Sequence, residues 1–174
     1  MTPSTSATVD VIDHTVPLAT GEPLHSLRQQ RPKIVAATQG SYEAMFSAAV
    51  TGISVVERLL VALHACRLSG AVALAEHYRE RLQAEGADPA LVGTVDQGAD
   101  QVIAADARVR ALLGFTRTLI EKPIEGDRKA VGALIAAGLS TPAVVAVSQL
   151  IAFLSYQIRL QAGLRAMAAA EMPA

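Results

Sequence analysis

His77 and Tyr78 are adjacent side chains that suit proton transfer. An imidazole held by a hydrogen bond acts as a general acid or base near neutral pH. A tyrosine packed inside a protein usually directs its hydroxyl to a polar partner. We predict His77 as a catalytic residue and Tyr78 as a substrate-binding residue, with ordinary packing of both as the alternative.

Two further side chains are candidates for the same site. Glu57 follows Ser54 in the S-x-x-E pattern of a helix capping box, and a carboxylate that assists His77 is its other role. Arg159 interrupts an apolar segment and can reach a carboxylate on a ligand or on a neighbouring chain. We predict Glu57 as catalytic and Arg159 as substrate-binding. A helix cap and an ion pair near a subunit contact are the alternatives.

Cys66 is the single cysteine, so the chain cannot run an intramolecular dithiol–disulfide cycle. One cysteine also excludes a disulfide framework and a cysteine-rich zinc site. Cys66 continues an apolar stripe at helical spacing, which is typical of a buried free thiol. A one-cysteine peroxidase is the less favoured alternative. His64 lies off that stripe, and we expect it to be exposed.

Composition narrows the function classes further. The net charge is −1 and the basic residues are scattered, so nucleic-acid binding is not expected. The sequence has no glycine-rich phosphate loop, no G-x-S-x-G and no H-E-x-x-H. The N-terminus lacks the basic and apolar parts of a signal peptide. We therefore expect a cytoplasmic protein with no cofactor and no metal.

We expect helices to position these residues. The chain is 51% hydrophobic but only 3% aromatic, and it is rich in Ala and Leu, which are strong helix formers. No segment alternates with period two for long enough to form a strand. We predict an all-α helical bundle in one domain, 23–174, preceded by an extended N-terminal arm, 1–22. Helices are expected from Pro23 to an interruption at Pro32, over 33–47, 54–69, 71–85, a short one from Asp88, one ending near Ile120, 127–137 and 141–168.

The stretch 130–158 carries no charge and is long enough to cross a bilayer. The segment 138–142, with a glycine and a proline, divides it into two shorter pieces. We predict no membrane span, and burial of the final helix inside the domain or at a subunit contact.

The order of these segments resembles the AhpD-like, carboxymuconolactone decarboxylase (CMD) superfamily. Peroxidase members carry a Glu and then C-x-x-C-x-x-x-H on a helix pair. Placing His77 at the family histidine puts the thiol positions on Gly70 and Ala73, and the Glu position on Arg58, one residue from Glu57. The resemblance covers nearly the whole chain and rests on the segments 57–63, 77–79, 112–123, 134–140 and 149–159. Two further segments, 10–13 and 41–46, resemble a subgroup of CMD-domain proteins.

The resemblance implies two functions. Peroxidase members use the missing cysteine pair, whereas decarboxylase members act on a small carboxylated lactone without cysteines. We therefore expect a cofactor-independent decarboxylase or isomerase for a small organic acid, with His77 moving the proton and Arg159 or Arg58 holding the carboxylate. The alternative is a non-catalytic oligomeric accessory or ligand-binding protein related to alkylhydroperoxidases. Family members are usually homo-oligomers, so a dimer, trimer or hexamer is expected.

Overall fold

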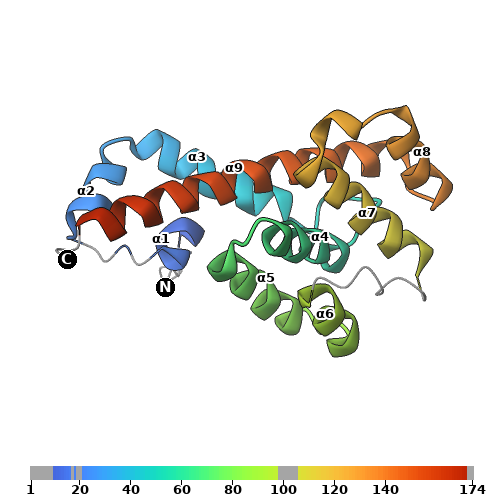
Figure 1. Ribbon diagram of the computed structural model, residues 1–174, viewed down its shortest axis with the longest axis horizontal. Helices are drawn as coiled ribbons and strands as arrows, with labels where there is room; N and C mark the ends of the chain where they lie inside the picture. The colour runs from blue at the N-terminus through green and yellow to red at the C-terminus, as the bar shows by residue number, and fades with distance from the viewer. Residues whose placement is uncertain (1–9, 17, 19–20, 98–105, 172–174) are drawn as a thin grey trace, which may run out of the picture.

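The computed structural model describes residues 10–16, 18, 21–97 and 106–171, and no strand occurs among them (Figure 1). The prediction of an all-α fold is confirmed. The helices in chain order are α1 (Val11–Thr15), α2 (Pro23–Gln29), α3 (Pro32–Met45), α4 (Val55–Leu68), α5 (Val72–Ala84), α6 (Pro89–Asp96), α7 (Ala107–Glu121), the 3-10 turn η2 (Pro123–Glu125), α8 (Arg128–Ala136) and α9 (Thr141–Glu171).

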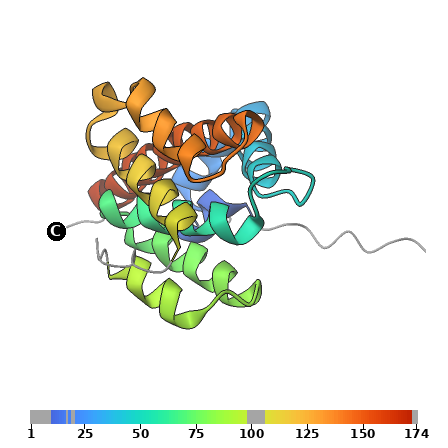
Figure 2. The same cartoon turned by 90° about the vertical axis from the view of Figure 1, so that its right-hand side faces the viewer.

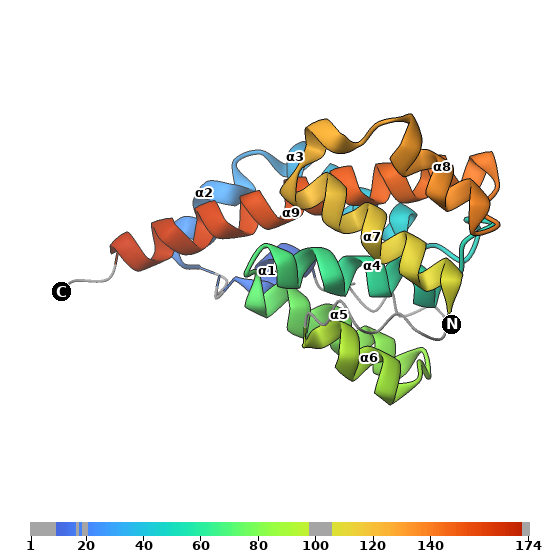
Figure 3. The same ribbon diagram turned by 45° about the vertical axis from the view of Figure 1, so that its right-hand side comes forward.

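Helix α4 is the centre of the bundle, in contact with α5, α6, α7 and α9 (Figures 2 and 3). Because it is covered on several sides, every residue from Arg58 to Cys66 is buried. His64 is only 4% exposed, so the expectation that it faces solvent is wrong. A single apolar stripe marks one buried face, but a central helix buries polar side chains on its other faces as well.

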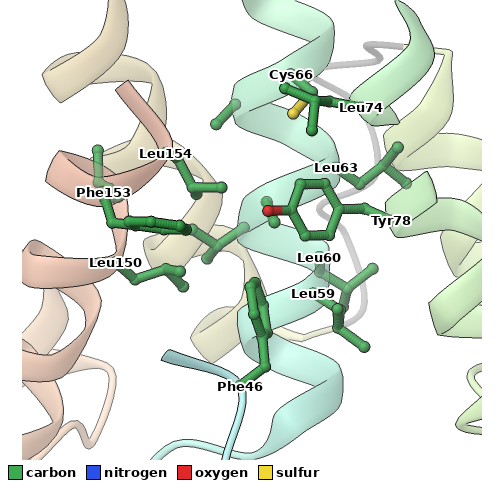
Figure 4. Close-up of a cluster of buried hydrophobic side chains, with 14 of the residues drawn as sticks. Phe46, Leu59, Leu60, Leu63, Cys66, Leu74, Tyr78, Leu150, Phe153 and Leu154 are labelled. Carbon is green, nitrogen blue, oxygen red and sulfur yellow. The ribbon is translucent and has the colours of Figure 1, made fainter. Parts of the chain in front are cut away.

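The core next to α4 is formed by side chains from several helices. Figure 4 shows the ring of Tyr78 reaching from α5 across α4 toward Phe153 and Leu150 of α9, with Phe46 beside it. The rings of Phe46 and Tyr78 lie 5.4 Å apart between centroids. This packing fixes the register of α5 against α9, and it fixes the neighbouring His77 with it.

The predicted capping box is confirmed at the start of α4. The Ser54 hydroxyl accepts the Glu57 amide, and the Glu57 carboxylate accepts the Ser54 amide at 2.7 Å. Such a cap satisfies two backbone N–H groups that a helix leaves without intrahelical partners.

Part of the segment predicted as an arm forms a helix that the sequence analysis did not predict. The Asp10 carboxylate caps α1 by accepting the amides of Ile12 and Asp13. Arg28 of α2 then binds both Asp10 and Asp13, and Ile12 is fully buried. Cap, ion pairs and burial together hold α1 against the body. Residues 1–9 of the arm lie outside the described part of the chain.

Helix α9 runs the length of the molecule, and its C-terminal half extends beyond α4 and α5 beside α2 (Figure 3). Among the described residues, Thr141–Ala170 is the one helix long and apolar enough to cross a membrane, and 39% of its most apolar window is buried. Its N-terminal half belongs to the core, since Val147, Leu150 and Leu154 are fully buried.

Candidate functional site

Tyr42 and His77 form a hydrogen-bonded pair between α3 and α5. The Tyr42 hydroxyl lies 2.7 Å from Nε2 of His77. The same hydroxyl accepts a hydrogen bond from Arg81, at 2.8 Å. An oxygen that accepts from a guanidinium still has its own proton, so Tyr42 can donate to Nε2 of His77 when Nε2 carries no proton. The remaining ring proton of a neutral His77 is then on Nδ1.

Arg81 follows His77 by one helical turn, which puts both side chains on the same face of α5. Its guanidinium also lies over two rings, 5.4 Å from the centroid of Tyr42 and 5.0 Å from that of Phe46. These contacts hold the cation beside the tyrosine oxygen. Because a guanidinium has five N–H donors, Arg81 retains donors beyond the one given to Tyr42.

Burial is the main electrostatic influence on this cluster. It lowers the pKa of His77 to about 4, with smaller contributions in the same direction from Arg81 and His14. Burial also raises the pKa of Tyr42, and the positive charge of Arg81 opposes that rise. The imidazole is therefore neutral at pH 7 and can accept a hydrogen bond, and the phenol is protonated and can donate one.

His14 on α1 completes the surroundings of His77. It is exposed, and its ring centroid lies 6.1 Å from that of His77. His77 itself is half-buried between this exposed ring and the buried ring of Tyr78, whose centroid is 5.3 Å away. The Tyr42–His77 pair thus lies where the core meets the surface.

Tyr78 is on the core side of this cluster. It is fully buried, and its hydroxyl donates to Oε1 of Gln157 on α9 at 2.5 Å. The Nε2 atom of Gln157 is buried without a hydrogen-bond partner. Tyr78 supports His77 from the core side, because its fully buried ring packs edge-on against the imidazole.

Glu57 lies in a different network. Besides the helix cap, its Oε1 accepts Nε of Arg108 at 2.5 Å, and Arg108 also donates to the carbonyls of Gly52 and Gly138. Although burial raises the pKa of Glu57, the hydrogen bonds from Arg108 and Ser54 lower it below the usual value overall. Glu57 thus joins the start of α4 to α7 and to the turn before α9.

The two arginines expected to bind a carboxylate lie apart from His77. Arg159 is exposed on α9. Arg58 is 1% exposed and donates to the backbone carbonyls of Met45, Ser47 and Ser54. Of the four side chains predicted for the site, the structure brings together His77 and Tyr78, and it places Glu57 and Arg159 elsewhere.

The positions that the resemblance assigns to thiols lie around the turn before α5. Gly70 lines a hollow of about 280 Å³ between this turn and α9, and its φ of +67° suits a glycine. Cys66 lies in the core, fully buried, and burial raises the pKa of its thiol. A thiol with a raised pKa is a poor nucleophile.

Neither a hollow nor a metal-binding group marks another candidate site at the predicted residues. Three hollows are described: the one at Gly70, one between α5 and α6, and one between α2, α3 and α9. None is lined by His77, Glu57 or Arg159. Within the described ranges, no group of three or more His, Cys, Asp or Glu side chains is arranged to hold a metal ion. The Tyr42–His77–Arg81 cluster is the candidate site.

Comparison with known proteins finds similar solved structures. No protein-family model and no curated protein matches the chain. The structure is similar to that of an uncharacterized peroxidase-related protein from Silicibacter sp. TM1040, with a TM-score of 0.69, 17% identity, and coverage of 98% of this chain and 95% of that one. It is also similar to the debrominase Bmp8, with a TM-score of 0.68, 15% identity, and coverage of 88% and 79%.

The chain has the AhpD-like fold. The resemblance predicted from the order of segments is confirmed at the level of the fold. Bmp8 has been solved without ligand and, as a variant with a cysteine replaced by alanine, in complex with 2,3,4-tribromopyrrole. At 15–17% identity these likenesses establish architecture and leave the chemistry to this chain's own residues.

Sequence reasoning missed two of the three residues in the candidate site. Arg81 could have been found, because it follows His77 by four residues on a predicted helix. Tyr42 had no such signal, since 35 residues separate it from His77 and only the packing of α3 on α5 joins them.

Proposed function

We propose that this AhpD-like protein is a cofactor-independent acid–base enzyme of the isomerase or decarboxylase type, acting on a small carboxylated substrate. The observation that carries the proposal is the Tyr42 hydroxyl, which lies between a neutral imidazole at 2.7 Å and a guanidinium at 2.8 Å. A phenol placed in this way can pass a proton while a cation stabilises the negative charge that develops.

The proton-transfer step follows from this order of groups. A C–H bond next to a substrate carbonyl breaks, and its proton goes to the Tyr42 oxygen as the Tyr42 proton passes to Nε2 of His77. The electron pair stays on the substrate as an enolate beside Arg81, and the reverse transfer returns the proton to the same or another carbon. In a decarboxylation the carbon–carboxylate bond breaks instead, carbon dioxide leaves, Tyr42 supplies the proton to that carbon, and the resulting phenolate takes up a proton from water.

Arg81 replaces Arg159 and Arg58 as the proposed carboxylate-binding residue. It lies next to the proton-carrying oxygen, whereas Arg58 is committed to three backbone carbonyls. The bound tribromopyrrole of the Bmp8 variant supports a small organic ligand on this fold. Halogen removal is not carried over to this chain.

Turnover of a carboxylated unsaturated γ-lactone by the full chain tests the proposal. We expect His77→Gln to lower kcat about 10²- to 10⁴-fold, the usual contribution of a general acid or base. Arg81→Met should raise KM, and the matched variant Arg159→Met should leave KM unchanged. If Arg159→Met raised KM and Arg81→Met left it unchanged, Arg159 would be the carboxylate-binding residue, as predicted from the sequence.

A specific observation also favours the non-catalytic alternative. The Tyr42–His77 pair joins α3 to α5, and none of the described hollows lies against it. In that case Tyr42→Phe would cost about 2 kcal/mol of folding stability, the usual contribution of the two hydrogen bonds that the Tyr42 hydroxyl makes. No substrate in a lactone and oxo-acid panel would then be turned over in a His77-dependent way.

A further inference from the structure

An apolar groove lies where α2, α3 and the C-terminal half of α9 pack together (Figure 1). Its volume is about 400 Å³, which is within the range of small-molecule sites. Aliphatic side chains from all three helices form most of its wall: Leu24, Leu27, Ile34, Leu160, Leu164 and Met167. Leu27, Ile34 and Met167 are 43–56% exposed. A concave apolar wall that is open to water is typical of a ligand site.

Thr38 and Tyr156 mark one end of the groove, since they are the last residue of α3 and the first of α9 that line it. Their hydroxyl oxygens lie 3.0 Å apart. The Thr38 hydroxyl donates to the carbonyl of Ile34 at 2.9 Å, so the proton between the two hydroxyls comes from Tyr156. Because both hydroxyl protons are committed, this end offers a ligand no hydroxyl donor, and a carboxylate gains nothing there.

Two arginines line the groove at the corner between α2 and α3. Arg28 is already neutralised, since it binds Asp10 and Asp13. Arg31 is exposed, and among the described residues it has no ion-pair partner. The described residues that line the groove include no carboxylate. The groove therefore presents one uncompensated positive charge, at the corner, above an aliphatic wall.

We propose that this groove binds a monocarboxylic acid with a linear apolar chain, such as a medium-chain fatty acid. The carboxylate lies on Arg31, and the chain runs along the aliphatic wall toward Tyr156. Arg31 and Thr38 are seven residues apart on α3, or about 10 Å. At about 30 Å³ for each water-sized group, 400 Å³ suits a chain of about eight to ten carbons with its carboxylate.

The composition of the wall favours a flexible chain over a flat ring. Tyr156 is the one aromatic side chain among the described lining residues, so the wall offers little surface for ring stacking. Met167 and the leucines are flexible or rounded side chains that follow the shape of an aliphatic ligand.

The size and charge of the groove favour a small molecule over a protein or a membrane. A specific protein interface takes about 20–30 residues from each partner, whereas twelve residues line this groove. A bilayer surface is recognised by a cluster of basic residues, and Arg31 is a single uncompensated charge. None of Tyr42, His77 and Arg81 lines the groove, so it is a second site that does not depend on the proposed function.

Isothermal titration calorimetry of the full chain with sodium octanoate tests the proposal. We expect saturable binding with a dissociation constant below about 1 mM. Arg31→Met should raise this constant about 5-fold, because it removes the ion pair. Lys33→Met is the matched control at an exposed cation of α3 that does not line the groove, and it should change the constant less than about 2-fold. With 1-octanol, which has no charge, Arg31→Met should bind as the wild type does.

A carboxylate placed in the groove tests the same site in a second way. Ile34→Glu should raise the dissociation constant for octanoate at least about 10-fold, because it adds a like charge and removes part of the apolar wall. Ile34 is 56% exposed and Glu favours helix, so the variant should remain folded, as circular dichroism will show. Ala37→Glu, at an exposed position of α3 outside the groove, is the matched control and should bind as the wild type does.

The Met167 methyl signal in NMR spectra locates the ligand. Octanoate should shift this signal, assigned by its loss in Met167→Leu, with the midpoint found by calorimetry. His77→Gln should bind octanoate like the wild type, which separates this proposal from the acid–base one. Absence of saturable binding, binding that Ile34→Glu leaves unchanged, or an equal effect of Arg31→Met on 1-octanol would overturn the proposal. So would a chain that binds anionic phospholipid vesicles but not free octanoate.

Discussion

The pKa of His77 makes the stability of the protein depend on pH in a direction that can be stated in advance. Its ordinary pKa is 6.5, and burial lowers it to about 4 in the folded chain. The unfolded chain therefore takes up the proton first as pH falls. The contribution of neutral His77 to the free energy of unfolding is fully present above pH 6.5 and is lost as pH falls from 6.5 to about 4.

The size of the effect follows from the same values. A pKa that moves from 6.5 to about 4 corresponds to about 3 kcal/mol between the two protonation states. Solvent screening at a half-buried ring reduces this contribution to about 1–2 kcal/mol. The free energy of unfolding of the wild type should therefore fall by about 1–2 kcal/mol more than that of His77→Gln between pH 7 and pH 4.

Denaturant unfolding of both proteins at a series of pH values measures this difference. Comparison with His77→Gln cancels the carboxylates that titrate in the same range, including Asp13, whose pKa is raised mainly by burial. His14→Gln is the control, because it removes only the smallest of the three contributions to the His77 pKa. A stability difference that does not vary with pH, or an NMR titration of His77 near 6.5, would refute the reasoning.

Three further predictions concern residues outside the candidate site. Glu57→Ala should cost about 1–2 kcal/mol in thermal or denaturant unfolding, because it removes a helix cap and the partner of Arg108; an unchanged midpoint would contradict the cap. Arg58→Ala should cost about 3 kcal/mol or more by the same assay, since it removes three hydrogen bonds from a buried guanidinium to backbone carbonyls. The Cys66 thiol should react with a disulfide reagent at least 100-fold more slowly in the native protein than in urea, and comparable rates would show an accessible thiol.

The fold could be predicted from the sequence to a large extent because its helices carry local start and stop signals. Asp88 before Pro89 starts α6, Gly86 and Gly138 take the left-handed backbone conformation after α5 and α8, and Ser54 with Glu57 caps α4. These signals need no knowledge of tertiary contacts. Helix α1 was missed because its cap, Asp10, precedes only one turn of helix and depends on burial of Ile12 for support.

The candidate site was less accessible to sequence reasoning because it depends on contacts between distant segments. His77 was identified by its residue type and its place beside an apolar face. Its partner Tyr42 is on another helix, and no local pattern joins the two. The same limit applies to Arg58 and His64, whose burial follows from the central position of α4 rather than from their own helix.

The proposed function depends most directly on whether His77 moves protons on a substrate carbon. Proton NMR in deuterium oxide, with a carboxylated unsaturated γ-lactone as the probe, follows replacement of carbon-bound hydrogen by deuterium. The account predicts exchange catalysed by the wild-type chain and slowed about 10²-fold or more in folded His77→Gln. Exchange at the same rate in His77→Gln, or none above the protein-free rate with wild type, would contradict it.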